Sequence, residues 1–106
     1  MQLNDFQKQA LQSAAITDKN VAALAHRTLG LSGEAGVLAN AIKKVIRDKN
    51  GELSDEDILF IEEKVGDVLY YAAVLADYAE LSLEDIAQKN LEKSTAFKKQ
   101  KLDKKV

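Results

Sequence analysis

The sequence has no cysteine, no proline and no tryptophan among its 106 residues. Without cysteine the chain has neither disulfides nor thiolate metal sites, although this absence does not identify the compartment in which the protein works. Aromatic residues make up only 6% of the chain, whereas strands favour aromatic and β-branched residues and turns favour proline. Abundant Ala, Leu, Lys, Glu and Ile favour helices instead. The composition therefore predicts an all-α protein.

Strong charge of one sign and long apolar runs are also missing. The formal net charge is -2 with acids and bases interspersed, which argues against binding to a nucleic-acid polymer. No apolar run approaches the about 20 residues of a membrane span, and the first residues do not resemble a signal peptide. We therefore expect a cytoplasmic protein without a membrane partner. A chain of 106 residues with 46% apolar content predicts one domain, residues 1–106, that can self-associate.

Capping residues and apolar periodicity predict four helices joined by short connections. Ser54 with Asp57, and Ser82 with Asp85, resemble capping boxes that begin the third and fourth helices. The third helix is apolar over a wide arc, so a partner subunit is needed to cover what one chain leaves exposed. We therefore expect a four-helix bundle-like fold completed by oligomerisation. The expected helices span about residues 4–15, 19–48, 54–80 and 82–97, and the basic tail of about 98–106 is expected to fray.

Three glycines at intervals of three, Gly30, Gly33 and Gly36, lie inside the second predicted helix. A glycine in a helix interior costs about 1 kcal/mol relative to alanine. The three glycines therefore predict a close approach of another helix or room for a ligand beside the backbone. A long helix with this pattern is also expected to bend or break between Gly30 and Gly33.

Acidic residues lie between apolar neighbours on the second and third predicted helices. Glu63 and Asp67 are four residues apart, so their carboxylates can converge on one ion, and Glu34 can supply a third carboxylate. Carboxylate oxygens without His or Cys suit Mg²⁺ or Mn²⁺ rather than zinc. Magnesium held in this way commonly supports phosphoryl chemistry. Ordinary surface charge is the simpler interpretation of the spacing alone.

Two segments and the helix after them resemble a known family. Residues 30–36 (GLSGEAG), followed by residues 42–44 (IKK), resemble the first signature of the MazG-like nucleoside triphosphate pyrophosphohydrolases. Residues 65–71 (VGDVLYY) resemble the second signature, and residues 81–93 resemble the helix that follows it. The resemblance implies an all-α dimer or tetramer that cleaves nucleoside triphosphates to the monophosphate and pyrophosphate. It also implies Mg²⁺ held by acids in an E-x-x-E and an E-x-x-D pattern.

The sequence departs from this pattern at two of the four acids. Glu34 matches the first acid, but Val37 stands at the second; Asp67 matches the last, but Lys64 stands three residues before it. Glu63 can reach the same ion from the other flank of the helix, since residues four apart face within about 40° of each other. The two replacements change the local charge by about three units, which should weaken Mg²⁺ binding. Lys64 can replace part of the metal's charge by pairing with Glu34 or a phosphate, or it can extend to water.

The resemblance also implies residues near the substrate. Lys44, Asn90 and Lys93 match family positions near the phosphates, and His26 lies on the same flank of its helix as Lys44, where it could face a base or a phosphate. Solvated lysines and a histidine with a packing role are the structural alternatives.

The resulting prediction is a Mg²⁺-dependent nucleotide pyrophosphohydrolase, with Mn²⁺ as a possible substitute, whose activity is attenuated by Val37 and Lys64. In this prediction Glu34, Glu63 and Asp67 hold the metal, and Glu34 also orients the attacking water. The alternative is a non-catalytic MazG-like homologue that binds nucleotides or acts through its oligomer interface. A homodimer or homotetramer is expected in either case.

Overall fold

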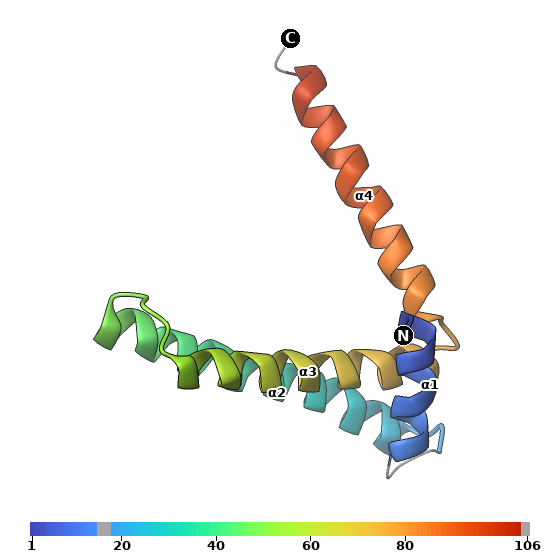
Figure 1. Ribbon diagram of the computed structural model, residues 1–106. Coiled ribbons are helices and arrows are strands. Elements are labelled where there is room, and N and C mark those ends of the chain that lie inside the picture. The colour runs from blue at the N-terminus through green and yellow to red at the C-terminus, as the bar shows by residue number, and fades with distance from the viewer. Residues whose placement is uncertain (15–17, 105–106) are drawn as a thin grey trace.

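The computed structural model describes residues 1–14 and 18–104. This part of the chain contains helices and no strand, which confirms the predicted all-α fold with four helices (Figure 1). No helix within it has the length and apolar character needed to cross a membrane. The predicted end of the first helix, at Ala15, lies outside the described residues. The four helices are α1 (Leu3–Ser13), α2 (Val21–Lys49), α3 (Asp55–Tyr78) and α4 (Leu83–Lys104).

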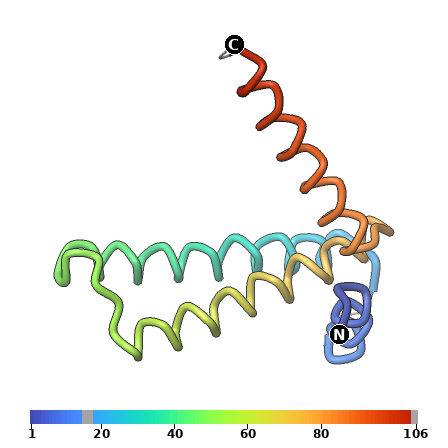
Figure 2. The backbone as a smooth tube through the Cα atoms, turned by 45° about the horizontal axis from the view of Figure 1, so that its top comes forward, coloured from blue at the N-terminus to red at the C-terminus, as the bar shows by residue number. Residues whose placement is uncertain are grey.

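Helices α2 and α3 form a long antiparallel hairpin, and they lie side by side in two views of the backbone (Figures 1 and 2). The chain reverses at Asn50, with φ 55°, and Gly51, with φ 83°. These left-handed conformations favour asparagine and glycine, and they end α2 where the sequence predicts. The hairpin sets residues of α2 directly opposite residues of α3.

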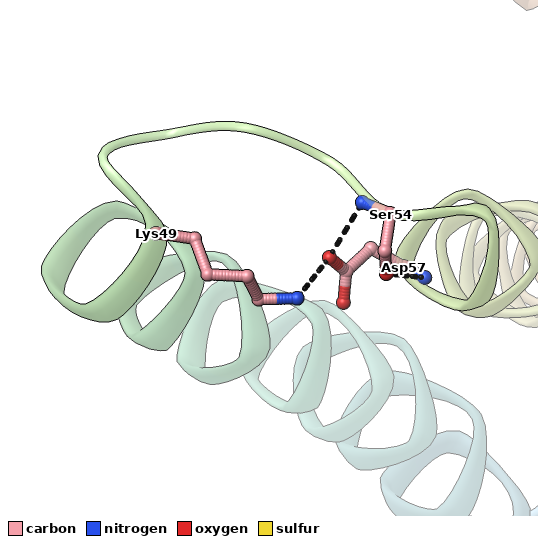
Figure 3. Close-up of polar contacts among 3 residues, drawn as sticks. All are labelled: Lys49, Ser54 and Asp57. Carbon is pink, nitrogen blue, oxygen red and sulfur yellow. Dashed lines mark hydrogen bonds and ion pairs between the residues drawn. The ribbon is translucent and has the colours of Figure 1, made fainter.

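The turn of the hairpin is held by the predicted capping box at the start of α3 (Figure 3). The backbone N–H of Asp57 donates to Ser54 Oγ at 3.2 Å, and the N–H of Ser54 donates to Asp57 Oδ2 at 2.9 Å. The ammonium of Lys49, from the last turn of α2, donates to the same Asp57 oxygen at 2.6 Å. The hydrogen bonds from Lys49 and Ser54 lower the pKa of Asp57 to about 2. Local capping and one ion pair therefore close the turn.

Helix α2 runs without interruption through its three glycines, so the expected break is not present. A Cβ placed on Gly30 would overlap the ring of Tyr71, whereas a Cβ on Gly33 or Gly36 would meet no other atom within 4 Å. The predicted close approach of a neighbouring helix therefore applies to Gly30 alone among these three. The aromatic ring of α3 fills the space beside the bare backbone of α2, and this packing offsets part of the cost of glycine.

Helix α1 packs against α3 at the open end of the hairpin and against the start of α4. The buried core there is small, and Gln7 lies within it. The amide of Gln7 donates to the carbonyl oxygens of Ala73 and Leu81 at 3.1 and 3.0 Å, and its oxygen accepts from the N–H of Leu83 at 3.1 Å. One side chain thus satisfies three backbone groups of three segments. The buried core cluster consists of Ala10, Ala73, Val74 and Leu83.

Asn4 is of a residue type that often caps helices, but it lies inside α1. Gln2 caps this helix, and the N–H of Gln2 donates to Asp5 at 3.0 Å. Asn4 Oδ1 instead accepts hydrogen bonds at the start of α4, from Ser82 Oγ at 2.8 Å and from the N–H of Glu84 at 3.2 Å. Short polar side chains cap whichever helix end is near in space, so tertiary packing decided this assignment.

Helix α4 projects away from the hairpin and contacts α1 and α3 near its start (Figures 1 and 2). Every residue from Gln88 to Lys104 is exposed. The radius of gyration is 17.2 Å, compared with about 13 Å for a compact chain of this length. The single chain is therefore an open arrangement of helices, and completion of the bundle by a second copy stays a prediction. The basic tail, expected to fray from about residue 98, is helical as far as Lys104.

Candidate functional site

The middle of the hairpin brings together Glu34, Lys64 and Asp67, which we call the Lys64 cluster. The ammonium nitrogen of Lys64 lies 3.0 Å from Glu34 Oε2 and 3.4 Å from Asp67 Oδ2. Glu34 comes from α2, while Lys64 and Asp67 are three residues apart on one face of α3. The side chain of Lys64 is only 16% exposed, and those of Glu34 and Asp67 are 28% and 44% exposed. The sequence left open whether Lys64 pairs with Glu34, pairs with a phosphate or extends to water, and pairing with Glu34 is confirmed.

The electrostatics of the cluster keep Lys64 charged. The hydrogen bond to Glu34 is the main factor that raises the pKa of Lys64 above its ordinary value, and the negative charges of Glu34 and Asp67 add to it against the opposing effect of burial. The ammonium also lies 5.6 Å from the centre of the Phe60 ring, within range of a cation–π attraction. Two carboxylates share one cation, so the cluster retains one net negative charge.

The three carboxylates expected to hold a metal do not converge. Across residues 1–14 and 18–104, no three Asp, Glu, His or Cys side chains are grouped in a way that could hold a metal ion. Glu63 is exposed on α3, about 100° around the helix from Lys64 and about 40° from Asp67. Val37, 47% exposed, offers no oxygen. The residues present therefore do not fit a resident Mg²⁺ or Mn²⁺ ion, and a metal-binding role for Glu34, Glu63 and Asp67 stays a prediction.

A pocket of about 410 Å³ opens on the hairpin between the Lys64 cluster and the turn. Val37, Asn40 and Lys44 of α2 line it together, as their shared helical flank predicts. Phe60 lies in its wall and also faces the ammonium of Lys64, so the pocket adjoins the cluster. The pocket can therefore place a ligand against Lys44 and near Lys64. The other lining residues are Ala41, Val45, Asp48, Lys49 and Asp57.

The other candidate substrate residues are not gathered in this pocket. His26 is exposed, and its ring centre lies 6.1 Å from that of Tyr71. Asn90 lines a separate apolar groove of about 390 Å³ at the junction of α1, α3 and α4. Lys93 is exposed on the projecting part of α4. Within one chain, Asn90 and Lys93 therefore do not share a pocket with Lys44, and their contact with phosphate stays a prediction.

Sequence reasoning missed Arg27, a buried cation near the open end of the hairpin. Its side chain donates to the carbonyl oxygen of Val74 at 2.9 Å and lies 5.8 Å from the centre of the Tyr78 ring. Only 3% of Arg27 is exposed. Arg27 lies on the face of α2 that packs on α3. This position along the helix is the feature of the sequence that could have indicated its burial. A charged residue on such a face is usually assigned to solvent, because arginine is seldom fully buried.

The fold and the site together define an all-α protein in which charged side chains of a long helical hairpin face each other beside a pocket. Residues 23–101 match the MazG nucleotide pyrophosphohydrolase domain, and the chain belongs to this family. The family assignment made from the sequence is confirmed. Because MazG proteins generally depend on divalent metal ions, a lysine between Glu34 and Asp67 is unexpected.

One phage protein is similar to the chain over most of its length. The chain is 39% identical over 74 residues to the gene 37 protein of Mycobacterium phage L5, a match that covers 70% of this chain and 65% of the phage protein. The matched region thus spans just under two thirds of that relative's length. No solved structure matches the chain.

Proposed function

We propose that the protein binds a nucleoside or deoxynucleoside triphosphate and cleaves it slowly to the monophosphate and pyrophosphate. The observation that carries the proposal is the placement of Glu34 and Asp67, the two acids of the family pattern that this chain retains, beside each other across α2 and α3. Membership of the MazG family supports the class of substrate. The loss of acids at Val37 and Lys64 is the reason to expect attenuated activity.

The residues of the site suggest how the ligand is held. In this proposal the phosphates enter the pocket beside Lys44, whose ammonium offsets their charge. Glu34 accepts a hydrogen bond from the attacking water. The water oxygen forms a bond to the phosphorus of the first phosphate, and a proton of the water passes to Glu34. The bond from this phosphorus to the bridging oxygen breaks, and pyrophosphate leaves with that oxygen. Mg²⁺ and Mn²⁺ are the ions that the family implies, and both belong in the assay.

A second candidate is a non-catalytic member of the family that binds nucleotides without cleaving them. The engagement of both retained acids with Lys64 favours it, because a carboxylate paired with an ammonium is a poorer acceptor for a water proton. The substitution of Val37 for an acid acts in the same direction. The two candidates share a ligand and differ in turnover.

Pyrophosphate release from a panel of ribo- and deoxyribonucleoside triphosphates separates the candidates. The natural protein and the Val37→Glu/Lys64→Glu double variant are compared, with nucleotide binding followed in parallel by thermal shift. We expect slow release by the natural protein and faster release by the variant. Binding without release in the natural protein, with release restored in the variant, would favour the second candidate. No binding and no release in either protein would refute both.

We also propose that the protein is a homodimer or homotetramer. Its accessible surface is 7997 Å², compared with about 5,900 Å² for a compact protein of this mass. The difference exceeds the roughly 800 Å² that each partner buries in a typical interface. Large apolar side chains lie exposed on three helices, including Leu29, Ile46, Ile58, Val65, Leu91 and Phe97. Sedimentation as a monomer at micromolar concentration would contradict the proposal.

A further inference from the structure

The Lys64 cluster places an ammonium where two facing carboxylates need a cation. Glu34 and Asp67 come from different helices and would repel each other if nothing lay between them. The Lys64 nitrogen lies 3.0 and 3.4 Å from their nearest oxygens, at or just beyond ordinary hydrogen-bond distance. A divalent ion bound by carboxylates would provide the same neutralisation from outside the protein. Here the neutralising charge is part of the chain.

We propose that Lys64 is a built-in cation that takes the place of a divalent metal between Glu34 and Asp67, so that nucleotide binding at this site needs no divalent ion. The first half of this proposal concerns the protein alone. The second half rests on the proposed function, because it assumes that a nucleotide is the ligand.

The covered position of Lys64 argues against its displacement by a metal. Its side chain is 16% exposed and packs with its ammonium over Phe60. A metal ion would have to break two charged hydrogen bonds and leave this ammonium beside a second cation in a partly covered position. It would gain two carboxylate ligands in return, because Val37 has none to offer and, among the described residues, no third acid is grouped with Glu34 and Asp67. Mg²⁺ also gives up its waters reluctantly.

The chemistry of an ammonium fits the role of a phosphate partner. Lysine has three N–H donors, and the two carboxylates require two of them. The third can serve an oxygen of a ligand phosphate that enters from the adjoining pocket, where Lys44 supplies a second positive charge. Phosphate charge is then offset by side chains from both helices of the hairpin, which is the task that a bridging metal ion performs elsewhere.

A purely structural ion pair is the competing explanation, and metal binding distinguishes the two. Mg²⁺ and Mn²⁺ are titrated into the nucleotide-free protein by calorimetry, and melting is followed in the same solutions. The variants are Lys64→Glu, Lys64→Gln and, as a matched control with the same charge change, Lys89→Glu on the exposed face of α4. We expect no saturable binding by the natural protein or by Lys89→Glu. Lys64→Glu should bind Mn²⁺ at least about tenfold more tightly and melt at higher temperature when it is present.

Two results would overturn the first half of the proposal. One is Mg²⁺ or Mn²⁺ binding by the natural protein as tight as that of Lys64→Glu; the other is no gain of binding in either Lys64 variant. If Lys64→Glu is unfolded without metal, Lys64→Gln provides the comparison, because it removes the cation without adding a charge. Recovery of folded Lys64→Glu by Mn²⁺ would support the proposal.

Nucleotide titration with a chelator present tests the second half. We expect the natural protein to bind its triphosphate with an affinity within about threefold in EDTA and in Mg²⁺, and Lys64→Gln to lose most of this binding in EDTA. Binding by the natural protein in Mg²⁺ alone would overturn the inference and leave the proposed function standing. No binding in either solution would instead remove the proposed function, while the metal titrations would still decide the role of Lys64.

Discussion

The hairpin of α2 and α3 contains two lysine–carboxylate contacts that differ in kind. At the turn, Lys49 joins an Asp57 carboxylate that also holds the backbone at the start of α3. In the middle, Lys64 joins Glu34 and Asp67, and the contacts are between side chains alone. A carboxylate bound to a backbone N–H, as Asp57 is, holds the fold, whereas carboxylates bound only to a lysine side chain can be released by moving that side chain. This difference is the reason why we propose the middle of the hairpin as the functional site.

The largest expected effect is a change of activity when the middle contact is replaced by acids. Val37→Glu/Lys64→Glu should raise pyrophosphate release in Mg²⁺ or Mn²⁺ on the order of 100-fold, because metal ions supply several kcal/mol of transition-state stabilisation. The assay is pyrophosphate release at saturating nucleotide. The control is Lys49→Glu at the turn, which should weaken the fold and, because Lys49 also lines the pocket, leave release no faster than in the natural protein. An equal gain in the control would erase the distinction between the two contacts.

The next effect concerns the packing that holds the middle of the hairpin together. Gly30→Ala should lower the free energy of unfolding by about 2 kcal/mol, because the added Cβ overlaps the ring of Tyr71. Gly33→Ala should raise it by up to about 1 kcal/mol, since the added Cβ meets no atom within 4 Å and alanine favours a helix. Chemical denaturation measures both. Equal effects of the two substitutions would show that Tyr71 does not restrict Gly30, or that Gly33 is covered in an oligomer.

A smaller effect is expected at the turn. Ser54→Ala removes the side chain that accepts from the N–H of Asp57 and should cost about 1 kcal/mol of unfolding free energy. Nucleotide binding should be unchanged, because Ser54 itself does not line the pocket and Asp57 keeps its contacts with Lys49 and with the N–H of residue 54. Denaturation and a nucleotide titration on the same preparation measure the two properties. Loss of binding at unchanged stability would contradict the assignment of the turn to the fold alone.

The smallest effect appears in the dependence of stability on pH. The pKa of Asp57 is lowered to about 2 in the folded protein, whereas an unfolded aspartate has a pKa of about 3.9. The carboxylate therefore stabilises the fold fully above about pH 4, and this contribution is lost as the pH falls towards 2. Asp57→Asn should flatten the acid limb of a melting-temperature profile between these values. Asp55→Asn, in the same first turn but outside the contacts of Figure 3, should flatten it less.

Local chemistry determined much of this protein from its sequence. Composition and helical periodicity predicted four helices, and the capping box of Ser54 and Asp57 placed the start of α3 to the residue. Asn50 and Gly51 ended α2 because few other residues adopt left-handed backbone conformations. The family was also predicted correctly, because segments of the sequence match the family's signatures in the same order and at the same spacing. These features depend on neighbours in the chain, so a single sequence contains the information.

Only the tertiary structure decided which distant groups meet. It paired Lys64 with Glu34 across thirty residues of chain, placed Gln7 against three backbone groups, and left α4 projecting into solvent. The three acids were expected to converge because their helical positions permit it, yet the ammonium of Lys64 engages two of them and Glu63 is not grouped with them. A pattern along one helix gives the direction of each side chain, but its partner depends on the register and angle of another helix, which packing of the whole chain sets.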